Sequence, residues 1–302
     1  MSTNLALLDL LVEKISIINP LQSRFLSTSL VQLVGSEAAD LVAYLSYARS
    51  QDISVNYLAE SYDLIVKDTL REQVYFRRHK RYRYSTFDEV ASFVYFDDEY
   101  MRKYMHGLAL TAYLWPNHRE LHRYFAKTIP KNSSGSYLEI GPGHGMYMMT
   151  AMRNSSYDEF NGIDLSPTSV AMTQALLQSG EFGSFDNFRI SEQNFLDGDL
   201  TPGRFAAVVM GEVLEHVENP HAFLTRIREI AADDAHIFIT TPINAPAIDH
   251  IYLFDSFDAI VSHVDSAGLS IQDKLLVPYP GMTVDESQEQ KLPINVALVL
   301  SK

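Results

Sequence analysis

Residues 137–145 read Tyr-Leu-Glu-Ile-Gly-Pro-Gly-His-Gly, a short apolar strand that runs directly into three alternating glycines. Glycine has no Cβ and tolerates positive φ, so such a turn lets the backbone approach a ligand closely and directs helix N-terminal amides toward it. Nineteen residues after the last glycine, the segment Phe-Asn-Gly-Ile-Asp ends at Asp164. An acidic residue that ends the next strand is where a Rossmann-like fold holds a ribose.

Two details distinguish this turn from the turn that binds dinucleotides. Its glycines alternate, whereas the dinucleotide turn has the spacing Gly-x-Gly-x-x-Gly, with a third glycine that packs the helix. Glu139 stands two positions before the first glycine, where it would repel a pyrophosphate but attract an aminopropyl cation such as that of S-adenosylmethionine. Both details disfavour a nicotinamide oxidoreductase.

The segment Leu-Glu-Ile-Gly-Pro-Gly-His-Gly resembles the first motif of the class I S-adenosylmethionine-dependent methyltransferases, and the resemblance covers roughly residues 136–302. It implies that Glu139 lies near the methionine amino group. Asp164 would accept hydrogen bonds from both ribose hydroxyls, because a carboxylate has two oxygens and no donor. Leu165 would pack on the adenine. Four glycines are expected beside the cofactor: Gly141, Gly143, Gly145 and Gly211.

The adenine contacts are expected after the third strand, where the family commonly has Gly-Asp followed by a small or aromatic residue. The matching stretch here is Gln-Asn-Phe at 193–195. Asn194 keeps an acceptor oxygen for the adenine N6 amine, and the Phe195 amide would reach N1. Asp197 is a competing acceptor if the register is shifted by three residues.

The composition limits the classes to which the chain can belong. Its 302 residues are 46% hydrophobic without an apolar run near 18 residues, so we expect a soluble protein with a large core. No signal-peptide pattern is visible, which favours the cytoplasm. Zero cysteines exclude disulfides, thiolate nucleophiles and cysteine-based metal sites. A net charge of −14 argues against generic nucleic-acid binding, although the basic stretch at 77–83 is either a solvated helix end or a site for an anionic partner.

The chain divides into a helical part and an alternating part. Residues 1–130 show helical spacing and almost no strand alternation, which predicts a helical cap or subdomain that could cover the active site or form a homodimer. From 131 to 302, strands alternate with helices, which predicts an α/β fold with a Rossmann-like sheet. Seven strands are expected, near 137–140, 160–164, 188–191, 205–210, 236–240, 270–277 and 294–300. Residues 278–291 are expected to form an exposed loop.

The sequence Gly-Glu-Val-Leu-Glu-His at 211–216 follows the fourth strand, where α/β sheets bind their substrates. Glu212, Glu215 and His216 could converge there, and two carboxylates with an imidazole suit a divalent cation such as Mg²⁺. The motif resembles that of the metal-dependent small-RNA terminal 2′-O-methyltransferases and of ubiquinone-pathway O-methyltransferases. In the RNA enzymes a downstream histidine completes the site, and His250 could have that role here.

Two other interpretations of these residues remain open. The same motif occurs in methyltransferases without a metal, where its Glu and His cap the next helix or touch substrate. Alternatively, His216 or His250 could act as a general base without a metal, because neutral imidazole accepts protons near pH 7.

Aromatic and basic residues gather just before the first strand of the sheet. The cluster contains Tyr104, His106, Tyr113, Trp115, His118, Arg119, His122 and Arg123. Aromatic residues at helical spacing are more often core residues, yet a helical cap commonly supplies the substrate pocket of a methyltransferase. We therefore expect one or two of them to contact the acceptor, with Tyr113, Trp115 and His118 as the candidates.

The main hypothesis is a methyltransferase that modifies an oxygen, nitrogen or carbon of a small molecule, either a specialised metabolite or a saccharide. Neither nucleic acid nor a membrane is expected as its partner. The first alternative is an RNA-terminal 2′-O-methyltransferase in which residues 77–83 bind phosphates. The second is a non-catalytic protein that binds S-adenosylmethionine, and the intact Glu-x-x-Glu-His motif argues against it.

Overall fold

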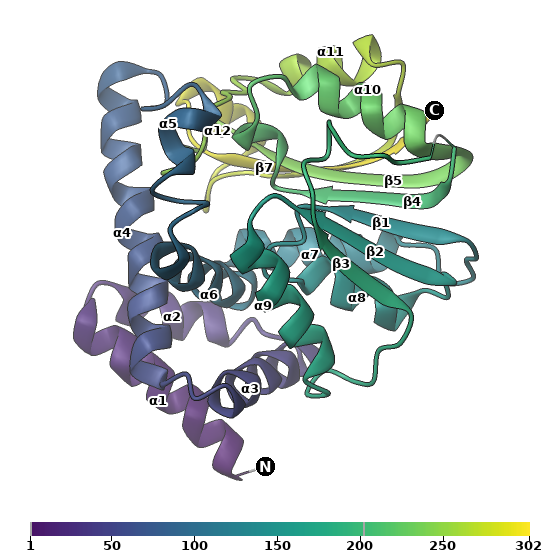
Figure 1. The fold of residues 1–302 in the computed structure, drawn as a ribbon. Coiled ribbons are helices and arrows are strands. Elements are labelled where there is room, and N and C mark those ends of the chain that lie inside the picture. Colours follow the sequence, from purple (N-terminus) through teal and green to yellow (C-terminus); the bar gives the residue numbers. More distant parts are fainter. Residues whose placement is uncertain (1, 202) are drawn as a thin grey trace.

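A seven-stranded sheet forms the centre of the molecule (Figure 1). The computed structural model describes residues 2–201 and 203–302. The strands are β1 (Ser136–Ile140), β2 (Glu159–Asp164), β3 (Phe188–Glu192), β4 (Phe205–Gly211), β5 (Ala231–Ile243), β6 (Ser270–Val277) and β7 (Ile294–Ser301). Their order across the sheet is β3-β2-β1-β4-β5-β7-β6. From β1 to β3 the strands follow one another toward one edge of the sheet, and from β4 on they lie toward the other edge, so the order of connection reverses between β1 and β4. The predicted α/β fold with a seven-stranded Rossmann-like sheet is confirmed.

Strands β1 to β5 are parallel, and β7 runs antiparallel to both of its neighbours. In the centre of the sheet, Ile140 at the end of β1 aligns with Ile163 of β2 and Met210 of β4. Alternate residues of β4 point to two separate cores, with Val209 in one and Val208 in the other. Strand β4 is apolar throughout because helices cover the sheet on both faces.

The two faces carry different helices (Figure 1). On one face lie α10 (Pro220–Ile230) and α11 (Phe257–Ser266), whose apolar residues share a core with the sheet. The other face is covered by α7 (Pro116–Thr128), α8 (Met146–Asn154) and α9 (Pro167–Gln178). The loops that connect β1 to α8 and β2 to α9 therefore lie at the same edge of the sheet.

The helices that precede this unit lie to one side of the sheet (Figure 1). They are α1 (Ser2–Ile18), α2 (Gln22–Leu30), α3 (Gly35–Ser50), α4 (Val55–His79), α5 (Phe87–Ala91) and α6 (Asp98–Leu114). Buried residues of α1, α3 and α4 belong to the same apolar cluster as residues of β1, so the core is continuous. The predicted helical N-terminal region is thus present, while its boundary at residue 130 stays a prediction. Among residues 2–201 and 203–302, no helix combines the length and apolar character needed to cross a membrane.

The segment 278–291, expected to be an exposed loop, contains the short helix α12 (Val284–Glu289). It begins with a capping box: the Glu286 amide donates to the Thr283 hydroxyl, and the Thr283 amide donates to the Glu286 carboxylate at 2.8 Å. The acidic residues that suggested a loop occupy the first turn of this helix, where the helix dipole favours negative charge.

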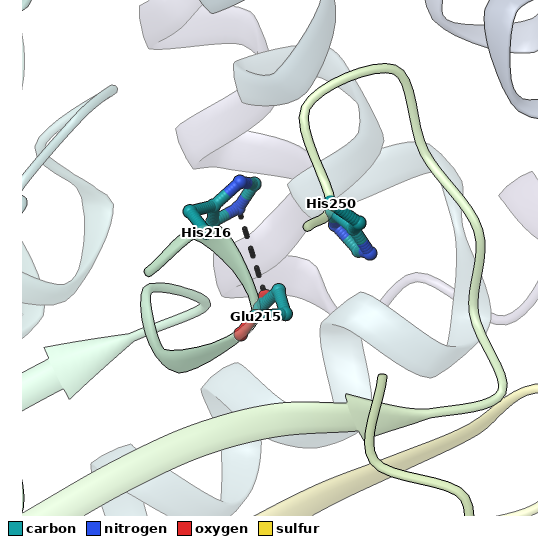
Figure 2. Close-up of side chains that lie close together, drawn as sticks. All are labelled: Glu215, His216 and His250. Carbon is teal, nitrogen blue, oxygen red and sulfur yellow. Dashed lines mark ion pairs between the residues drawn. The ribbon is translucent and has the colours of Figure 1, made fainter. Parts of the chain in front are cut away.

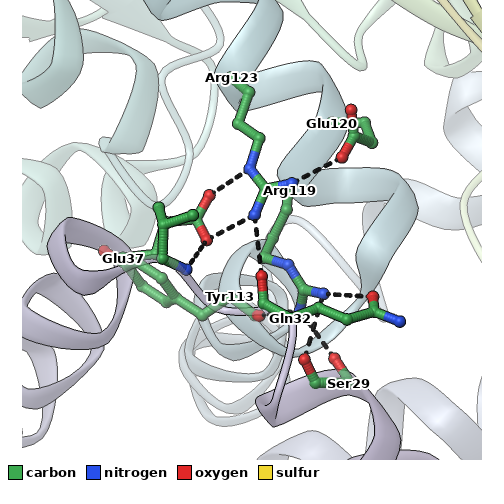
Figure 3. A network of polar contacts seen from close by, with 8 residues as sticks. Ser29, Gln32, Glu37, Tyr113, Arg119, Glu120 and Arg123 are labelled. Carbon is green, nitrogen blue, oxygen red and sulfur yellow. Dashed lines mark hydrogen bonds and ion pairs between the residues drawn. The ribbon is translucent and has the colours of Figure 1, made fainter.

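Two arginines of α7 tie this helix to the N-terminal helices (Figure 3). Arg119 is buried and donates to the Ser29 hydroxyl and the Tyr113 carbonyl, both at 2.7 Å. Arg123 donates to both carboxylate oxygens of Glu37, at 2.6 and 2.8 Å. Both cations are therefore engaged in fixing α7 against α2 and α3.

Replacing Arg119 by alanine should lower the free energy of unfolding by about 2–4 kcal/mol, because buried acceptors on α2 and α6 would lose their donors. Urea denaturation monitored by circular dichroism measures the change. The matched control is Arg24→Ala on α2, where the side chain is exposed and the expected change is within about 0.5 kcal/mol. Equal effects of the two substitutions would contradict a structural role for the Arg119 contacts.

Candidate active site

A cavity of about 960 Å³ opens at the carboxyl edge of the sheet, where β1 and β4 end. At this point the strand order reverses, and open α/β sheets bind ligands there. Its walls come from the loops after β1 to β5 and from helices α4, α6 and α7. Ligand pockets span roughly 300–1,000 Å³, so this cavity has room for a cofactor together with an acceptor.

The glycine turn forms part of the cavity floor. Gly141, Gly143 and Gly145 have φ values of 67°, 52° and 77°, a region that other residues rarely adopt. The Gly143 amide donates to Asp164 Oδ2 at 3.3 Å, which ties the turn to the end of β2. Gly141 and Gly143 line the cavity. Gly145 does not, and a Cβ there would press on Thr173 of α9 at 3.2 Å, so this glycine allows α8 and α9 to pack closely.

Four residues that the sequence assigned to ribose and adenine lie together on the cavity wall: Asp164, Leu165, Asn194 and Phe195. The Asn194 side chain also orders its own loop, because Oδ1 accepts from the Leu196 amide at 3.1 Å and Nδ2 donates to Asp197 at 2.7 Å. Asp197 itself does not line the cavity. Of the two acceptors proposed for the adenine amine, Asn194 is therefore the one that a ligand can reach.

Glu139 is 1% exposed and does not line the cavity. The Tyr137 hydroxyl donates to its carboxyl group at 2.7 Å. Burial raises the pKa of Glu139 from 4.5 to about 8, and the nearby Asp164 carboxylate contributes to the rise. Burial also raises the pKa of Asp164, to about 6. A buried carboxyl group, Glu139, and a half-buried one, Asp164, thus lie at this edge of the sheet, and no lysine or arginine of the described residues pairs with either.

The motif after β4 brings Glu215 and His216 close to His250, which follows β5 (Figure 2). One possible ligand atom of each residue lies within 4.8 Å of the other two. Glu215 is fully buried, and its Oε2 accepts from the Thr241 hydroxyl at 2.8 Å. Its Oε1 has no hydrogen-bond partner and lies 3.7 Å from His216 Nε2. Three of the four residues that the sequence assigned to a metal site therefore converge.

Glu212, the fourth residue, lies outside this close group. It has a φ of 53°, and its Oε1 is buried without a partner. Burial raises the pKa of Glu212, and the pKa of Glu215 is raised by burial and then by the Glu212 charge, so the two carboxyls interact. Glu212 and its neighbour Gly211 line the cavity, whereas Glu215 does not. A Cβ at Gly211 would meet the Tyr147 ring at 2.5 Å, which explains why glycine ends β4.

Hydrogen bonds leave the Nε2 atoms of both histidines free. His250 Nδ1 lies 2.6 Å from the Ala245 carbonyl, and His216 Nδ1 lies 3.1 Å from the Asp249 carbonyl. A carbonyl only accepts, so Nδ1 carries the proton in each neutral ring. One ligand atom of each ring converges with one of Glu215, and the free Nε2 atoms and the unpartnered Glu215 Oε1 are donors that suit a metal ion. Metal-binding histidines commonly donate their other N–H to a carbonyl in this way.

Two tyrosines and an aspartate support His216, and the sequence analysis did not identify this role. The Tyr95 hydroxyl lies 3.0 Å from His216 Nδ1 and donates to Asp249 Oδ2 at 3.2 Å. The Tyr104 hydroxyl donates to Asp249 Oδ1 at 3.0 Å. Tyr95 precedes His216 by 121 residues, so no sequence spacing relates them. The abundance of aromatic residues between 93 and 104 is the one signal that could have drawn attention to this segment.

The three residues predicted to contact the acceptor have different positions. Trp115 and His118 line the cavity. Tyr113 does not, because its hydroxyl points into the core and contacts the Met146 sulfur at 3.1 Å. His122, one helical turn beyond His118, lines the cavity instead.

Glu139→Gln should flatten the pH dependence of stability in the ligand-free protein. The pKa of Glu139 is higher in the folded state than its ordinary 4.5, so folding favours the protonated carboxyl. The wild-type free energy of unfolding should therefore fall as pH rises from about 4.5 to about 8, by up to about 1.4 kcal/mol per pH unit. Glutamine does not ionise, so the variant should become the more stable protein toward pH 8.

Urea denaturation across this pH range measures both profiles. Asp164 should leave a smaller slope of the same sign in the variant, below about pH 6. Parallel profiles for the two proteins would show that Glu139 titrates normally.

A family model described as a methyltransferase domain matches residues 101–274. A comparison with curated proteins finds no match. Among solved structures, a chain from the complex of the Haloferax volcanii Trm112 methyltransferase activator is similar, with a TM-score of 0.54, 12% identity and coverage of 69% of this chain and 98% of that one. The geranyl diphosphate C-methyltransferase of Streptomyces coelicolor A3(2), solved with Mg²⁺, geranyl diphosphate and S-adenosyl-L-homocysteine, has a TM-score of 0.51, 15% identity and coverage of 74% and 90%.

At these identities the solved structures show a shared fold. The family match covers more than half of the chain and includes the glycine turn, Asp164 and the motif after β4. The chain therefore belongs to the methyltransferase-domain family and is an S-adenosylmethionine-dependent methyltransferase.

Proposed function

We propose that this methyltransferase acts on a small-molecule acceptor without phosphate groups, and that a divalent cation assists the transfer. The charge of the cavity is the observation that carries the proposal. Of the described residues that line it, none is lysine or arginine, and four are acidic: Asp164, Glu212, Glu218 and Asp249. Proteins recognise phosphate mainly through cationic side chains, so on these walls a phosphate-bearing acceptor would depend on the proposed divalent cation for a positive partner.

Three of the apolar residues that line the cavity are exposed to solvent. Leu70, Phe96 and Leu196 are 52%, 54% and 39% exposed. Grouped apolar side chains on a surface commonly mark a binding site. They support an acceptor with a sizeable apolar part, as in a specialised metabolite, over a saccharide.

The RNA-terminal alternative has less support. None of residues 77–83 lines the cavity. Within this stretch, Arg83 is engaged by the buried Glu72 at 2.9 Å and lies over the ring of Tyr75 at 4.3 Å. The stretch therefore offers fewer free cations to a phosphate backbone than its sequence suggested.

The donor set supports a cation at the convergent group. Glu215, His216 and His250 would hold it, with Glu212 available as a further ligand. A divalent cation at this place would lower the pKa of an acceptor hydroxyl and orient the acceptor. If no cation binds, the Nε2 atom of either ring could accept the hydroxyl proton, because the Nδ1–H of each ring is directed at a carbonyl and leaves Nε2 as the acceptor.

The protein's remaining contribution is orientation and exclusion of water. Asp249 and Tyr95 hold His216, and the Ala245 carbonyl holds His250. Methyl transfer requires nucleophile, methyl group and sulfur to be aligned in a site without water. Helices α4 and α6 wall the cavity on the side away from the sheet, which suits this requirement.

Glu215→Gln should remove cation binding and methyl transfer together. Glutamine can still accept from Thr241 but supplies no negative charge. We expect calorimetric Mn²⁺ affinity to fall at least about tenfold, and transfer of labelled methyl groups to a panel of phosphate-free phenols, catechols and alcohols to stop. EDTA should have the same effect on the wild type, with recovery on adding Mg²⁺ or Mn²⁺.

The control is Glu218→Gln, which removes a charge from the same cavity outside the convergent group. It should leave Mn²⁺ binding unchanged. Full activity in EDTA would refute the role of a cation. Labelling of RNA termini with a steep salt dependence, and none of the small molecules, would favour the RNA alternative.

Asp164→Ala should weaken binding of S-adenosylhomocysteine about 100-fold or more, because two hydrogen bonds from ribose hydroxyls to a carboxylate would be lost. Isothermal titration calorimetry measures this affinity. Asp197→Ala is the comparison: Asp197 does not line the cavity and acts only through its contact with Asn194, so its loss of affinity should be much smaller. The reverse result would move the acidic contact to Asp197.

A further inference from the structure

Three histidines form one wall of the cavity. His118 and His122 lie one helical turn apart on α7 and therefore share a face of this helix. His144 comes from the glycine turn, and its ring centre lies 6.1 Å from that of His122. All three line the cavity, and they lie apart from the convergent group of Glu215, His216 and His250. We call them the histidine wall.

The hydrogen bonds of the wall determine which ring nitrogens carry a proton and which are left free to bind a ligand. The Met146 amide donates to His144 Nδ1 at 3.3 Å, so Nε2 carries the proton in the neutral ring and is a donor. His122 stacks on Tyr147 with ring centres 4.3 Å apart, and neither of its ring nitrogens has a hydrogen-bond partner among the described residues. At least two N–H donors of the wall are therefore available to a ligand.

His118 is held by the preceding helix. The Thr111 hydroxyl donates its single proton to the Leu108 carbonyl at 2.8 Å. His118 Nδ1, 3.0 Å from the same hydroxyl oxygen, must therefore donate to it. The remaining Nε2 of the neutral ring can accept a proton. Protonation of this ring would add a positive donor to the wall.

With all three of its rings neutral, the histidine wall is suited to bind an anion. Burial lowers the pKa of His118 and of His144 to about 4, and it lowers the pKa of His122 well below 6.5. Three neutral rings can lie together without mutual repulsion, and an anion placed among them would favour protonation of one. No lysine or arginine of the described residues lines the cavity, so no other side chain offers a cation there.

One anionic group is required by the cofactor itself. S-adenosylmethionine ends in an α-carboxylate, and its methionine part is expected along the glycine turn that carries His144. The adenosine end is expected at Asp164 and Asn194, which also line the cavity. The carboxylate must then be held near the turn by donors other than lysine or arginine.

We propose that His118, His122 and His144 bind the α-carboxylate of S-adenosylmethionine, with His122 and His144 donating to its oxygens. The proposal rests on S-adenosylmethionine as the cofactor, and it is independent of the acceptor and of the divalent cation. It assigns to the histidine wall the role that an arginine or lysine would otherwise have.

The test compares two ligands that differ only in this carboxylate. S-adenosylhomocysteine carries it, and 5′-deoxy-5′-(3-aminopropylthio)adenosine lacks it but keeps the amino group. Isothermal titration calorimetry of both compounds is carried out on the wild type and on His122→Phe, which keeps an aromatic ring against Tyr147 but has no N–H. We expect His122→Phe to bind S-adenosylhomocysteine about tenfold more weakly and the analogue as tightly as the wild type does.

Two further variants sharpen the result. His118→Phe should repeat the selective loss. His221→Phe on α10, the same substitution at an exposed histidine that does not line the cavity, should change neither affinity. Retained affinity for the analogue shows that each variant is folded.

The outcomes separate this proposal from the cofactor assignment. Unchanged affinity for S-adenosylhomocysteine in His122→Phe and His118→Phe overturns the carboxylate site and leaves the wall to the acceptor. An equal loss for both ligands also overturns it, because the effect would then not depend on the carboxylate. If neither compound binds the wild type, the cofactor assignment fails and the histidine site fails with it.

Discussion

The constraint on which this site depends is a set of acidic groups buried at the carboxyl edge of the sheet, which no lysine or arginine of the described residues balances. Glu139 is 1% exposed and Glu215 is fully buried. An unpaired charge in such a place is unfavourable by several kcal/mol, which is why burial raises the pKa of both groups. Neither group lines the cavity, so a positively charged ligand bound there would act on them through its electric field and favour their ionised forms. The ammonium and sulfonium groups of S-adenosylmethionine, and a divalent cation, are ligands of this kind.

The carboxyl groups of the cavity and the histidine wall come from different elements. Asp164 ends β2, Glu212 and Glu218 follow β4 and Asp249 follows β5, whereas the histidine wall comes from α7 and the glycine turn. The cofactor has the matching distribution, with positive charge at its centre and a carboxylate at its methionine end. Because no lysine or arginine of the described residues lines the cavity, the proposed carboxylate site depends on neutral N–H donors, which the histidine wall offers.

The N-terminal helices are part of this site because they position α7. Arg119 and Arg123 could have been substrate contacts on their sequence, since they lie among the aromatic residues before β1. In the structure both are bound within the protein, to Ser29 and Glu37 among others (Figure 3). The positions of His118 and His122 therefore depend on the contacts that Arg119 and Arg123 make with residues about 90 positions earlier in the chain. The helical region acts on the cavity both as a wall and as a support.

The sequence alone determined the sheet, its place in the chain and the cofactor turn. These features are encoded locally. Apolar runs form strands, and alternating glycines permit positive φ. The acidic residue that ends the next strand contacts the turn, since Asp164 accepts a hydrogen bond from the Gly143 amide. Only the tertiary structure decided which neighbours of these motifs face the cavity. It directs Tyr113 into the core and His122 to the wall, separates Glu212 from the close group, and brings Tyr95 to His216 across 121 residues. Helix rotation and contacts between distant segments decide these positions, and neither leaves a spacing that can be read from the sequence.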